Sequence, residues 1–255
     1  MDKIYKQSNK KVSFGLVGKN IPYSFSKKYF TEKFEKLNLS DYEFHNFDID
    51  NINKLPKILK KYPQLKGLSI TIPYKEQVIE FLDEISIEAK EIGAVNCIKI
   101  IDKKLVGFNT DIYGFENSFK PLLKSNHQKA IILGTGGASK AIKYVLTKLS
   151  IPYISVSRNP GKDDEISYPS LTDAIIKEYQ IIINCTPVGT FPSINKYPKI
   201  PYKCLNETNY LFDLIYNPSE TILLKNGKKR GATIKNGLEM LEIQAEKAWE
   251  IWTSV

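Results

Sequence analysis

The sequence predicts a two-domain α/β protein. Apolar, strand-like runs alternate with helical patterns through the first 123 residues, and this alternation is typical of a mainly parallel sheet. A polar break at residues 125–129 separates these elements from a second group, which begins with the apolar run 131–133. That run leads into Gly134-Thr135-Gly136-Gly137 and then into a helical pattern. A strand, a glycine turn and a helix N-terminus in this order bind phosphate, so we predict a Rossmann-like second domain.

Composition excludes several classes of protein. The 255 residues carry a net charge of +9, but the lysines are dispersed and interleaved with acidic residues, as on a solvated surface. We find no zinc-finger spacing and no aromatic RNA-binding signature, so no nucleic-acid partner is expected. The three cysteines are widely spaced and form no Cys-x-x-Cys, which favours buried thiols in a reducing cytoplasm. No signal peptide is visible, and no apolar stretch approaches the ~18 residues that span a membrane.

The elements of the first domain follow from apolar periodicity. Predicted strands cover residues 12–18, 42–47, 65–73, 92–100 and 105–110, with a hairpin turn at Lys103-Lys104 before the last. Predicted helices cover residues 29–37, 52–60, 74–82 and 112–123.

The second domain continues in the same way. Predicted strands after the glycine turn cover residues 153–159, 180–183, 210–216 and 232–234. Predicted helices contain residues 141–149, 221–226 and 238–252, and the last has one apolar face that Gln244 interrupts.

Five polar residues among the first 111 positions are candidates for a site. Lys75 follows a strand at the edge where α/β sheets bind ligands, and a lysine at a helix start opposes the helix dipole; a solvated lysine is the alternative. Ser24 and Ser26 precede a helix, where they either cap it or bind a carboxylate. Asn96 lies in an apolar run and needs a hydrogen bond to backbone or to a ligand. Asp111 is either a first-turn helix residue or part of the site.

The second domain carries a candidate dinucleotide site. Gly134 permits the turn, and Gly136 lets the backbone approach a pyrophosphate. Ser139 stands where the third glycine of G-x-G-x-x-G is usual, and a turn without nucleotide is the alternative. The strand at residues 153–159 contains Ser157-Arg158 where NAD-binding folds usually carry Asp or Glu. Arginine suits the 2′-phosphate of NADP and can stack on adenine, so NAD is disfavoured.

Taken together and in chain order, several short motifs resemble those of the shikimate dehydrogenase family. The likeness covers nearly the whole chain, and it is specific because the motifs occur jointly and in the right order. They are Ser24-x-Ser26, Gly67-x-x-x-Thr71-x-Pro73-x-Lys75, Gly93-Ala94-Val95-Asn96, Asn109-Thr110-Asp111-x-x-Gly114-Phe115, Gly134-x-Gly136-Gly137-Ala138, Asn184-x-Thr186-x-x-Gly189, Asp213-x-x-Tyr216-x-Pro218-x-x-Thr221 and Gly237-x-x-Met240-Leu241-x-x-Gln244-Ala245.

The resemblance implies a substrate-binding domain of residues 1–110 and 238–255 and an NADP-binding domain of residues 111–237, in which 111–124 is a linking helix. The active site would lie in the cleft between them. The implied activity is reversible NADPH-dependent reduction of 3-dehydroshikimate to shikimate, a step of aromatic amino-acid (chorismate) biosynthesis. A quinate/shikimate dehydrogenase using NAD and a non-catalytic NADP-binding protein are the alternatives. The resemblance further implies a small-molecule substrate, a cytoplasmic monomer or homodimer, and no metal.

The resemblance also implies residue roles. Lys75 would donate a proton to the developing alkoxide, and Asp111 would orient the ammonium group and bind a substrate hydroxyl. The other substrate-binding positions are Ser24, Ser26, Thr71, Asn96, Tyr216 and Gln244. The cofactor-binding positions are Gly134, Gly136, Gly137, Ala138, Ser157, Arg158, Thr186, Ile215 and Gly237.

The sequence departs from the family pattern at five positions. Tyr23 stands where His is common, Lys27 where Pro is common, and Ser69 where Asn is usual. Ser157 replaces an Asn, and Pro187 replaces a Ser. We expect Tyr23 to narrow the mouth of the pocket and Ser69 to alter one hydrogen bond, with the reaction type unchanged.

Overall fold

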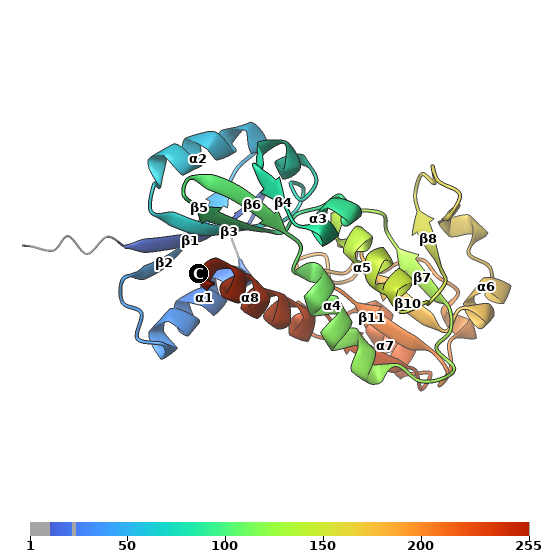
Figure 1. Cartoon of the computed structure of the whole chain (residues 1–255). Coiled ribbons are helices and arrows are strands. Elements are labelled where there is room, and N and C mark those ends of the chain that lie inside the picture. Colours follow the sequence, from blue (N-terminus) through green and yellow to red (C-terminus); the bar gives the residue numbers. More distant parts are fainter. Residues whose placement is uncertain (1–10, 22–23, 255) are drawn as a thin grey trace, which may run out of the picture. The chain divides into compact units, whose positions relative to one another are not determined.

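The structure is a computed structural model that describes residues 11–21 and 24–254. Its internal contacts divide the chain into two compact units (Figure 1). Unit 1 comprises Met1–Asn109 and Ala248–Val255, and unit 2 comprises Thr110–Lys247. The last helix, α8 (Leu238–Thr253), therefore contributes residues to both units.

Unit 1 contains a mixed six-stranded sheet in the order β2-β1-β3-β5-β6-β4. Strand β1 pairs in parallel with β2 and β3, and β4 pairs in parallel with β6, whereas β5 is antiparallel to both β3 and β6. The strands are β1 (Val12–Gly18), β2 (Tyr42–Asp48), β3 (Leu65–Ile70), β4 (Glu84–Ile85), β5 (Cys97–Ile101) and β6 (Lys104–Phe108). The helices are α1 (Phe25–Lys36), α2 (Leu55–Lys61) and α3 (Ile87–Ile92), with 3-10 turns η1 (Ile52–Lys54) and η2 (Gln77–Phe81).

Side chains on both faces of this sheet are buried. On one face, Phe14 of β1 stacks on Trp252 of α8 at 5.1 Å between ring centroids, and Phe30 of α1 joins this aromatic cluster. The Trp252 indole N–H also donates to the Ile98 carbonyl at 3.0 Å. On the other face, Val17 packs in a core with residues of α2. The end of α8 is thus part of the unit 1 core.

Unit 2 contains a six-stranded sheet in the order β12-β11-β10-β7-β8-β9, and every pairing in it is parallel within the described residues. The strands are β7 (Ala130–Leu133), β8 (Tyr153–Ser157), β9 (Glu165–Ser167), β10 (Ile181–Asn184), β11 (Tyr210–Asp213) and β12 (Thr233–Asn236). The helices are α4 (Asp111–Phe119), α5 (Gly137–Lys148), α6 (Asp173–Glu178) and α7 (Ile222–Lys228), with the 3-10 turn η3 (Lys120–Leu122) after α4.

Alternate residues of the central strands separate two cores in unit 2. Ile132, Ile183 and Phe212 pack in one core with residues of α4, α5 and the start of α8. Their neighbours Ile131 and Ile182 pack in the other core with residues of α6 and α7. Because strand side chains alternate between faces, helices cover both faces of the sheet (Figure 1). This is the doubly wound arrangement predicted for the second domain.

Some predicted elements are wrong in type or extent. The strand predicted from residue 92 begins at Cys97, because Ser86 caps helix α3 and Gly93, at φ 66°, ends it. Instead of a helix at residues 74–82, the chain forms a turn and the short 3-10 helix η2. Helix α4 ends at Phe119 rather than at Leu123, since Pro121 follows.

Other differences are smaller. The hairpin turn is formed by Asp102 and Lys103, both at positive φ, and Lys104 already belongs to β6. Sequence patterns did not predict the short elements α3, α6, β4 and β9.

Candidate functional site

The glycine turn lies between β7 and α5, as predicted. Gly134 has φ +100°, and its N–H donates to the Val156 carbonyl of the neighbouring strand at 2.9 Å. Gly136 is the N-cap of α5, and a Cβ built on it would meet nothing within 4 Å. Gly137 and Ala138 form the first turn of α5, whose N–H groups have no intrahelical partner. The turn therefore offers an open backbone surface to an anion.

Ser139 replaces the third glycine without disturbing the turn. Its side chain is 1% exposed, and its hydroxyl donates to the Gly136 carbonyl at 2.6 Å. A small buried residue at this position still permits close packing of α5 on the sheet, which is the role of the third glycine.

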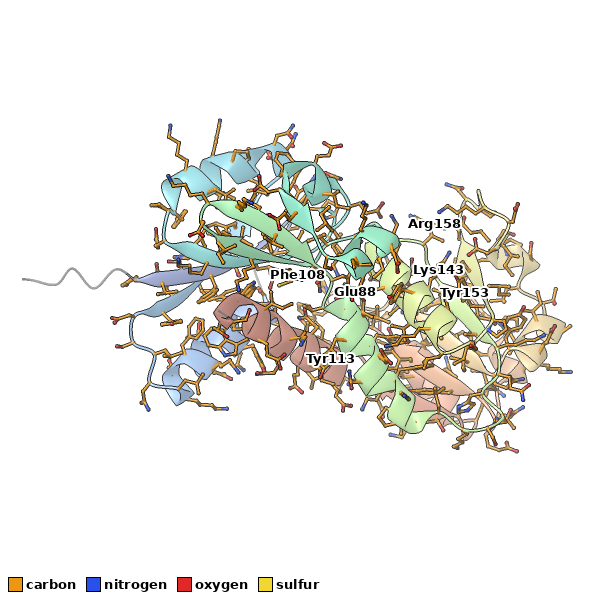
Figure 2. All side chains as sticks on the ribbon, in the orientation of Figure 1. Glu88, Phe108, Tyr113, Lys143, Tyr153 and Arg158 are labelled. Atoms are coloured by element: carbon orange, nitrogen blue, oxygen red, sulfur yellow. The ribbon has the colours of Figure 1, made fainter. Side chains whose placement is uncertain are left out.

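Arg158 follows β8 directly and is exposed; it is labelled in Figure 2. Ser157 ends the strand, and its hydroxyl accepts the N–H of Asn159 at 3.2 Å. The ammonium group of Lys143 in α5 pairs with the Asp164 carboxylate at 2.7 Å. Arg158 is thus an exposed guanidinium one strand away from the glycine turn.

The three further predicted cofactor positions, Thr186, Ile215 and Gly237, follow β10, β11 and β12 respectively. Thr186 donates from both its N–H (3.1 Å) and its hydroxyl (2.7 Å) to the Asn184 side-chain oxygen. The Gly237 N–H donates to the Ile215 carbonyl at 3.1 Å. Since the carboxyl ends of β7, β10, β11 and β12 lie at the same edge of one parallel sheet, these positions and the glycine turn lie at that edge.

In unit 1, Lys75 lies half-buried in the turn that follows β3. Its carbonyl accepts the N–H of Val95 at 2.7 Å, which joins the turn to the Gly93–Asn96 segment. The preceding Tyr74 is 2% exposed, and its hydroxyl donates to the Ile49 carbonyl at 2.6 Å. The backbone of Lys75 is therefore fixed from two directions. Sequence analysis overlooked Tyr74, although a tyrosine between a proline and a candidate lysine is a recognisable signal.

The other predicted residues of unit 1 lie at the same end of the sheet or in adjacent loops. Thr71 follows β3, and a Cβ on Gly18 would meet its methyl group at 2.5 Å. Asn96 is 4% exposed, and its backbone bonds to Ile70 and Phe108. Thr71, Lys75 and Asn96 are thus held by neighbouring backbone segments.

Ser24 and Ser26 lie at the start of α1. Ser24 is the N-cap of α1, with its hydroxyl oxygen accepting the Lys27 N–H at 3.3 Å, so the capping interpretation is confirmed for this residue. The cap uses the oxygen and leaves the hydroxyl proton free to donate to an anion. Ser26 is 8% exposed. Tyr23 lies outside the described residues.

In unit 2, Gln244 lies beside the start of α4. The Thr110 hydroxyl donates to the Gln244 side-chain oxygen at 3.1 Å, and Asp111, the next residue, is the first of α4 and 6% exposed. Gly114 allows this contact, since a Cβ there would meet the Met240 carbonyl at 2.5 Å. Gln244 therefore contacts the residue that directly precedes Asp111, although these two predicted substrate residues are 133 positions apart in the chain. Tyr216, a third, is 36% exposed after β11, and partial burial raises its pKa.

Two other features are absent from residues 11–21 and 24–254. Among these residues, no three His, Cys, Asp or Glu side chains are grouped so as to hold a metal ion. No helix among the same residues is long and apolar enough to cross a membrane.

A parallel sheet covered by helices on both faces, with an open glycine turn at its carboxyl edge, defines unit 2 as a Rossmann-like dinucleotide-binding fold. Comparison with known proteins agrees. The sequence model of the shikimate dehydrogenase substrate binding domain matches residues 16–98. A protein of Clostridium beijerinckii named shikimate dehydrogenase (NADP(+)) is 39% identical over 94% of this chain and 91% of its own length.

Solved structures show the same likeness. Shikimate dehydrogenase 1 from Peptoclostridium difficile superimposes with a TM-score of 0.82 at 38% identity, covering 96% of this chain and 93% of that one. The Thermus thermophilus shikimate 5-dehydrogenase in complex with NADP(H) and shikimate has a TM-score of 0.83 at 28% identity, covering 96% and 94%. The chain belongs to the shikimate dehydrogenase family.

Proposed function

We propose that this protein is an NADP-dependent oxidoreductase that reversibly reduces 3-dehydroshikimate to shikimate, in the aromatic amino-acid (chorismate) pathway of the cytoplasm. The observation that carries the proposal is the extent of the likeness: relatives named for this activity match 94% of the chain, and the match includes both the Lys75 turn and the glycine turn. A relative that matched only one domain would support the identity of the cofactor or of the substrate, but not a reaction that needs both.

The residues of unit 2 fit NADP. Three features support this cofactor: the helix N-terminus at Gly136 and Gly137 is open, Arg158 is exposed after β8, and no Asp or Glu stands at the end of that strand. The pyrophosphate would accept hydrogen bonds from the backbone N–H groups at the start of α5, and Arg158 would bind the 2′-phosphate. Thr186, Ile215 and Gly237 would contact the nicotinamide. These assignments make residues 111–237 the cofactor-binding part of the chain.

The residues of unit 1 fit the proton-transfer half of the reaction. Ketone reduction needs a hydride at carbon, which the nicotinamide supplies when bound, and a proton at oxygen. The Lys75 ammonium can stabilise the developing alkoxide and donate the proton. Asp111, which belongs to unit 2, would accept a hydrogen bond from a ring hydroxyl of the substrate. Shikimate formation therefore requires no metal at this site.

The remaining assignments concern binding of the substrate. Ser24 and Ser26 would donate hydroxyl hydrogen bonds to the substrate carboxylate, with Tyr216 as a further donor. Thr71, Asn96 and Gln244 would bind the ring hydroxyls. Residues 1–110 and 238–255 are thus proposed as the substrate-binding part, and the protein as a monomer or homodimer.

A single assay tests the activity. Purified protein, shikimate and NADP⁺ should produce NADPH, measured by absorbance at the nicotinamide band. The parallel reaction with NAD⁺ should be slower by at least about tenfold in kcat/KM, because Arg158 favours the 2′-phosphate, and a reaction with quinate in place of shikimate tests the alternative substrate. Faster turnover with NAD⁺ would replace NADP as the proposed cofactor, and faster turnover with quinate would replace shikimate as the proposed substrate. Absence of turnover despite measurable binding of NADPH and shikimate would favour a non-catalytic role.

A further inference from the structure

Asp213 ends β11 with a carboxylate that solvent does not reach, and the reaction as proposed above does not use it. Its Oδ1 accepts the Asn184 side-chain amide at 2.9 Å and the Ile215 backbone N–H at 3.1 Å. Its Oδ2 accepts the Thr221 hydroxyl at 2.6 Å. All three partners are donors, an arrangement that an ionised carboxylate satisfies.

Asn184 extends this set of hydrogen bonds to the loop after β10. Its amide nitrogen donates to Asp213, so its oxygen is oriented toward Thr186 and accepts both Thr186 donors. The Thr186 hydroxyl oxygen in turn accepts the Val188 N–H at 3.2 Å. The orientation of the Asn184 amide, and with it the place of Thr186, therefore depends on Asp213.

Four positions assigned to the cofactor are joined to this network. Thr186 and Ile215 are bonded as described, and Gly237 donates its N–H to the Ile215 carbonyl. A Cβ on Gly134 would meet the Thr186 methyl at 2.8 Å, so the glycine turn lies directly against Thr186. One buried carboxylate thus connects the loops after β7, β10 and β11.

We propose that Asp213 is a positioning residue that holds Thr186 and Ile215 in the geometry required at the nicotinamide end of the cofactor. The inference rests on the proposed function, because it takes NADP as the ligand of these loops. Asp213 touches neither substrate nor cofactor and acts through Asn184 and the Ile215 backbone. Burial raises the pKa of Asp213 to about 6, despite three hydrogen bonds that lower it, so the carboxylate remains mostly ionised at pH 7.5.

The chain offers a matched control at the other end of the same two strands. Asn209 is 3% exposed just before β11; its oxygen accepts the Asn206 N–H at 2.9 Å, and its amide donates to the Gln180 carbonyl before β10 at 3.2 Å. Asn209→Ala removes a buried polar bridge between β10 and β11, as Asp213→Ala does, but away from the glycine turn. It should lower stability and leave kinetic constants within about twofold of wild type.

The experiment compares wild type, Asp213→Ala, Asp213→Asn and Asn209→Ala. Hydride transfer is followed in a single turnover at saturating NADP⁺ and shikimate. Binding of 2′,5′-ADP, which carries the adenosine and 2′-phosphate but no nicotinamide, is measured as competitive inhibition against NADP⁺. We expect Asp213→Ala to slow hydride transfer about 10- to 100-fold, since small misplacements cost this much, and to change the 2′,5′-ADP inhibition constant less than threefold. Asp213→Asn keeps the Oδ1 acceptor and should recover most of the rate.

The outcomes separate the inference from the proposed function. Absence of turnover in wild type would overturn the function itself. Turnover in wild type together with an Asp213→Ala rate like that of Asn209→Ala would overturn only the positioning role. Equal losses of hydride transfer and 2′,5′-ADP binding would also overturn it, because they would reveal general damage to unit 2. If Asp213→Ala does not fold, Asn184→Ala, which breaks the link from Asp213 to Thr186 but keeps the Asp213 bonds to Ile215 and Thr221, carries the same expectation.

Discussion

The two glycines of the turn make separable predictions, because the structure gives them different reasons to be glycine. At Gly134, φ is +100°, and an added Cβ would lie 2.8 Å from the Thr186 methyl. The left-handed backbone costs an L-residue about 1–2 kcal/mol, and relieving the contact costs about 1–3 kcal/mol more. Gly134→Ala should therefore reduce the free energy of unfolding of the free protein by about 2–5 kcal/mol.

At Gly136, the backbone is ordinary for any residue and the space is open. Its φ is −78° and its ψ −179°, and a Cβ would meet nothing within 4 Å. Alanine is a poorer N-cap than glycine by several tenths of a kcal/mol but restricts the unfolded chain by a similar amount. Gly136→Ala should thus leave the free protein within about 1 kcal/mol of wild type. Its methyl would occupy the proposed approach of the pyrophosphate, so NADP⁺ affinity should fall about 10- to 100-fold.

The assay combines urea unfolding without ligand and calorimetric titration with NADP⁺. Unfolding is best followed by circular dichroism, because both tryptophans belong to unit 1 and the substitutions lie in unit 2. The reasoning is refuted if Gly136→Ala loses as much stability as Gly134→Ala. It is equally refuted if Gly136→Ala binds NADP⁺ as tightly as wild type, since the open space would then not be the phosphate site.

Three further predictions concern single side chains. Lys75→Ala should reduce turnover by about 10²-fold or more while changing the shikimate KM much less, and near-normal turnover would contradict its proton-donor role. Arg158→Ala should raise the NADP⁺ KM about 10- to 100-fold and leave the NAD⁺ KM nearly unchanged; equal effects on both cofactors would contradict the 2′-phosphate assignment. Because the pKa of Asp213 is raised to about 6, its contribution to stability is full below about pH 4 and lost as pH rises through 6. Between pH 4 and pH 7.5, the free energy of unfolding of Asp213→Asn should therefore rise by about 2.5 kcal/mol relative to that of wild type in urea unfolding, and a constant difference would contradict the shift. Burial raises the pKa values of the facing Cys185 and Tyr202, so both stay neutral in this range.

The sequence predicted unit 2 well because its elements are locally specified. Strands β7 and β10 are four-residue buried runs rich in isoleucine, bounded by residues that end strands. The glycines and the helical pattern of α5 follow at once. Here local preference, burial and topology agree, and only the shortest peripheral elements were missed.

Unit 1 was harder because burial and backbone conformation do not coincide there. Ala94 and Val95 are fully buried and apolar, like strand residues, yet they lie in an irregular segment after Gly93. The segment is buried because the Lys75 turn packs against it through the Val95 N–H. The hydrophobic pattern of a sequence indicates which residues are buried. For a buried segment as short as the one after Gly93, the backbone conformation depends on the tertiary contacts.

The roles of residues in the site depend on contacts that no local pattern contains. Asn184 and Asp213 are 29 positions apart, and each could be a strand-end polar residue exposed to solvent. What the sequence does contain is their common position, directly after three apolar residues of neighbouring parallel strands. Two polar residues that end adjacent buried strands must lie at one edge of the sheet, so their pairing could have been inferred once the strand order was known.

The energetics of Asp213 explain why such a residue is informative. A pKa raised by about two units means that the fold disfavours the ionised carboxylate by about 3 kcal/mol relative to the unfolded chain. If the end of β11 needed only a stable fold, an apolar side chain would serve there, because a protein with a well-packed apolar residue is often as stable as one with a buried charge, or more stable. An apolar side chain would, however, leave the Ile215 N–H and the Thr221 hydroxyl without their partner and would free the Asn184 amide to rotate. The carboxylate thus stabilises one arrangement of three loops at a cost to the stability of the whole unit, and those loops carry the positions assigned to the cofactor.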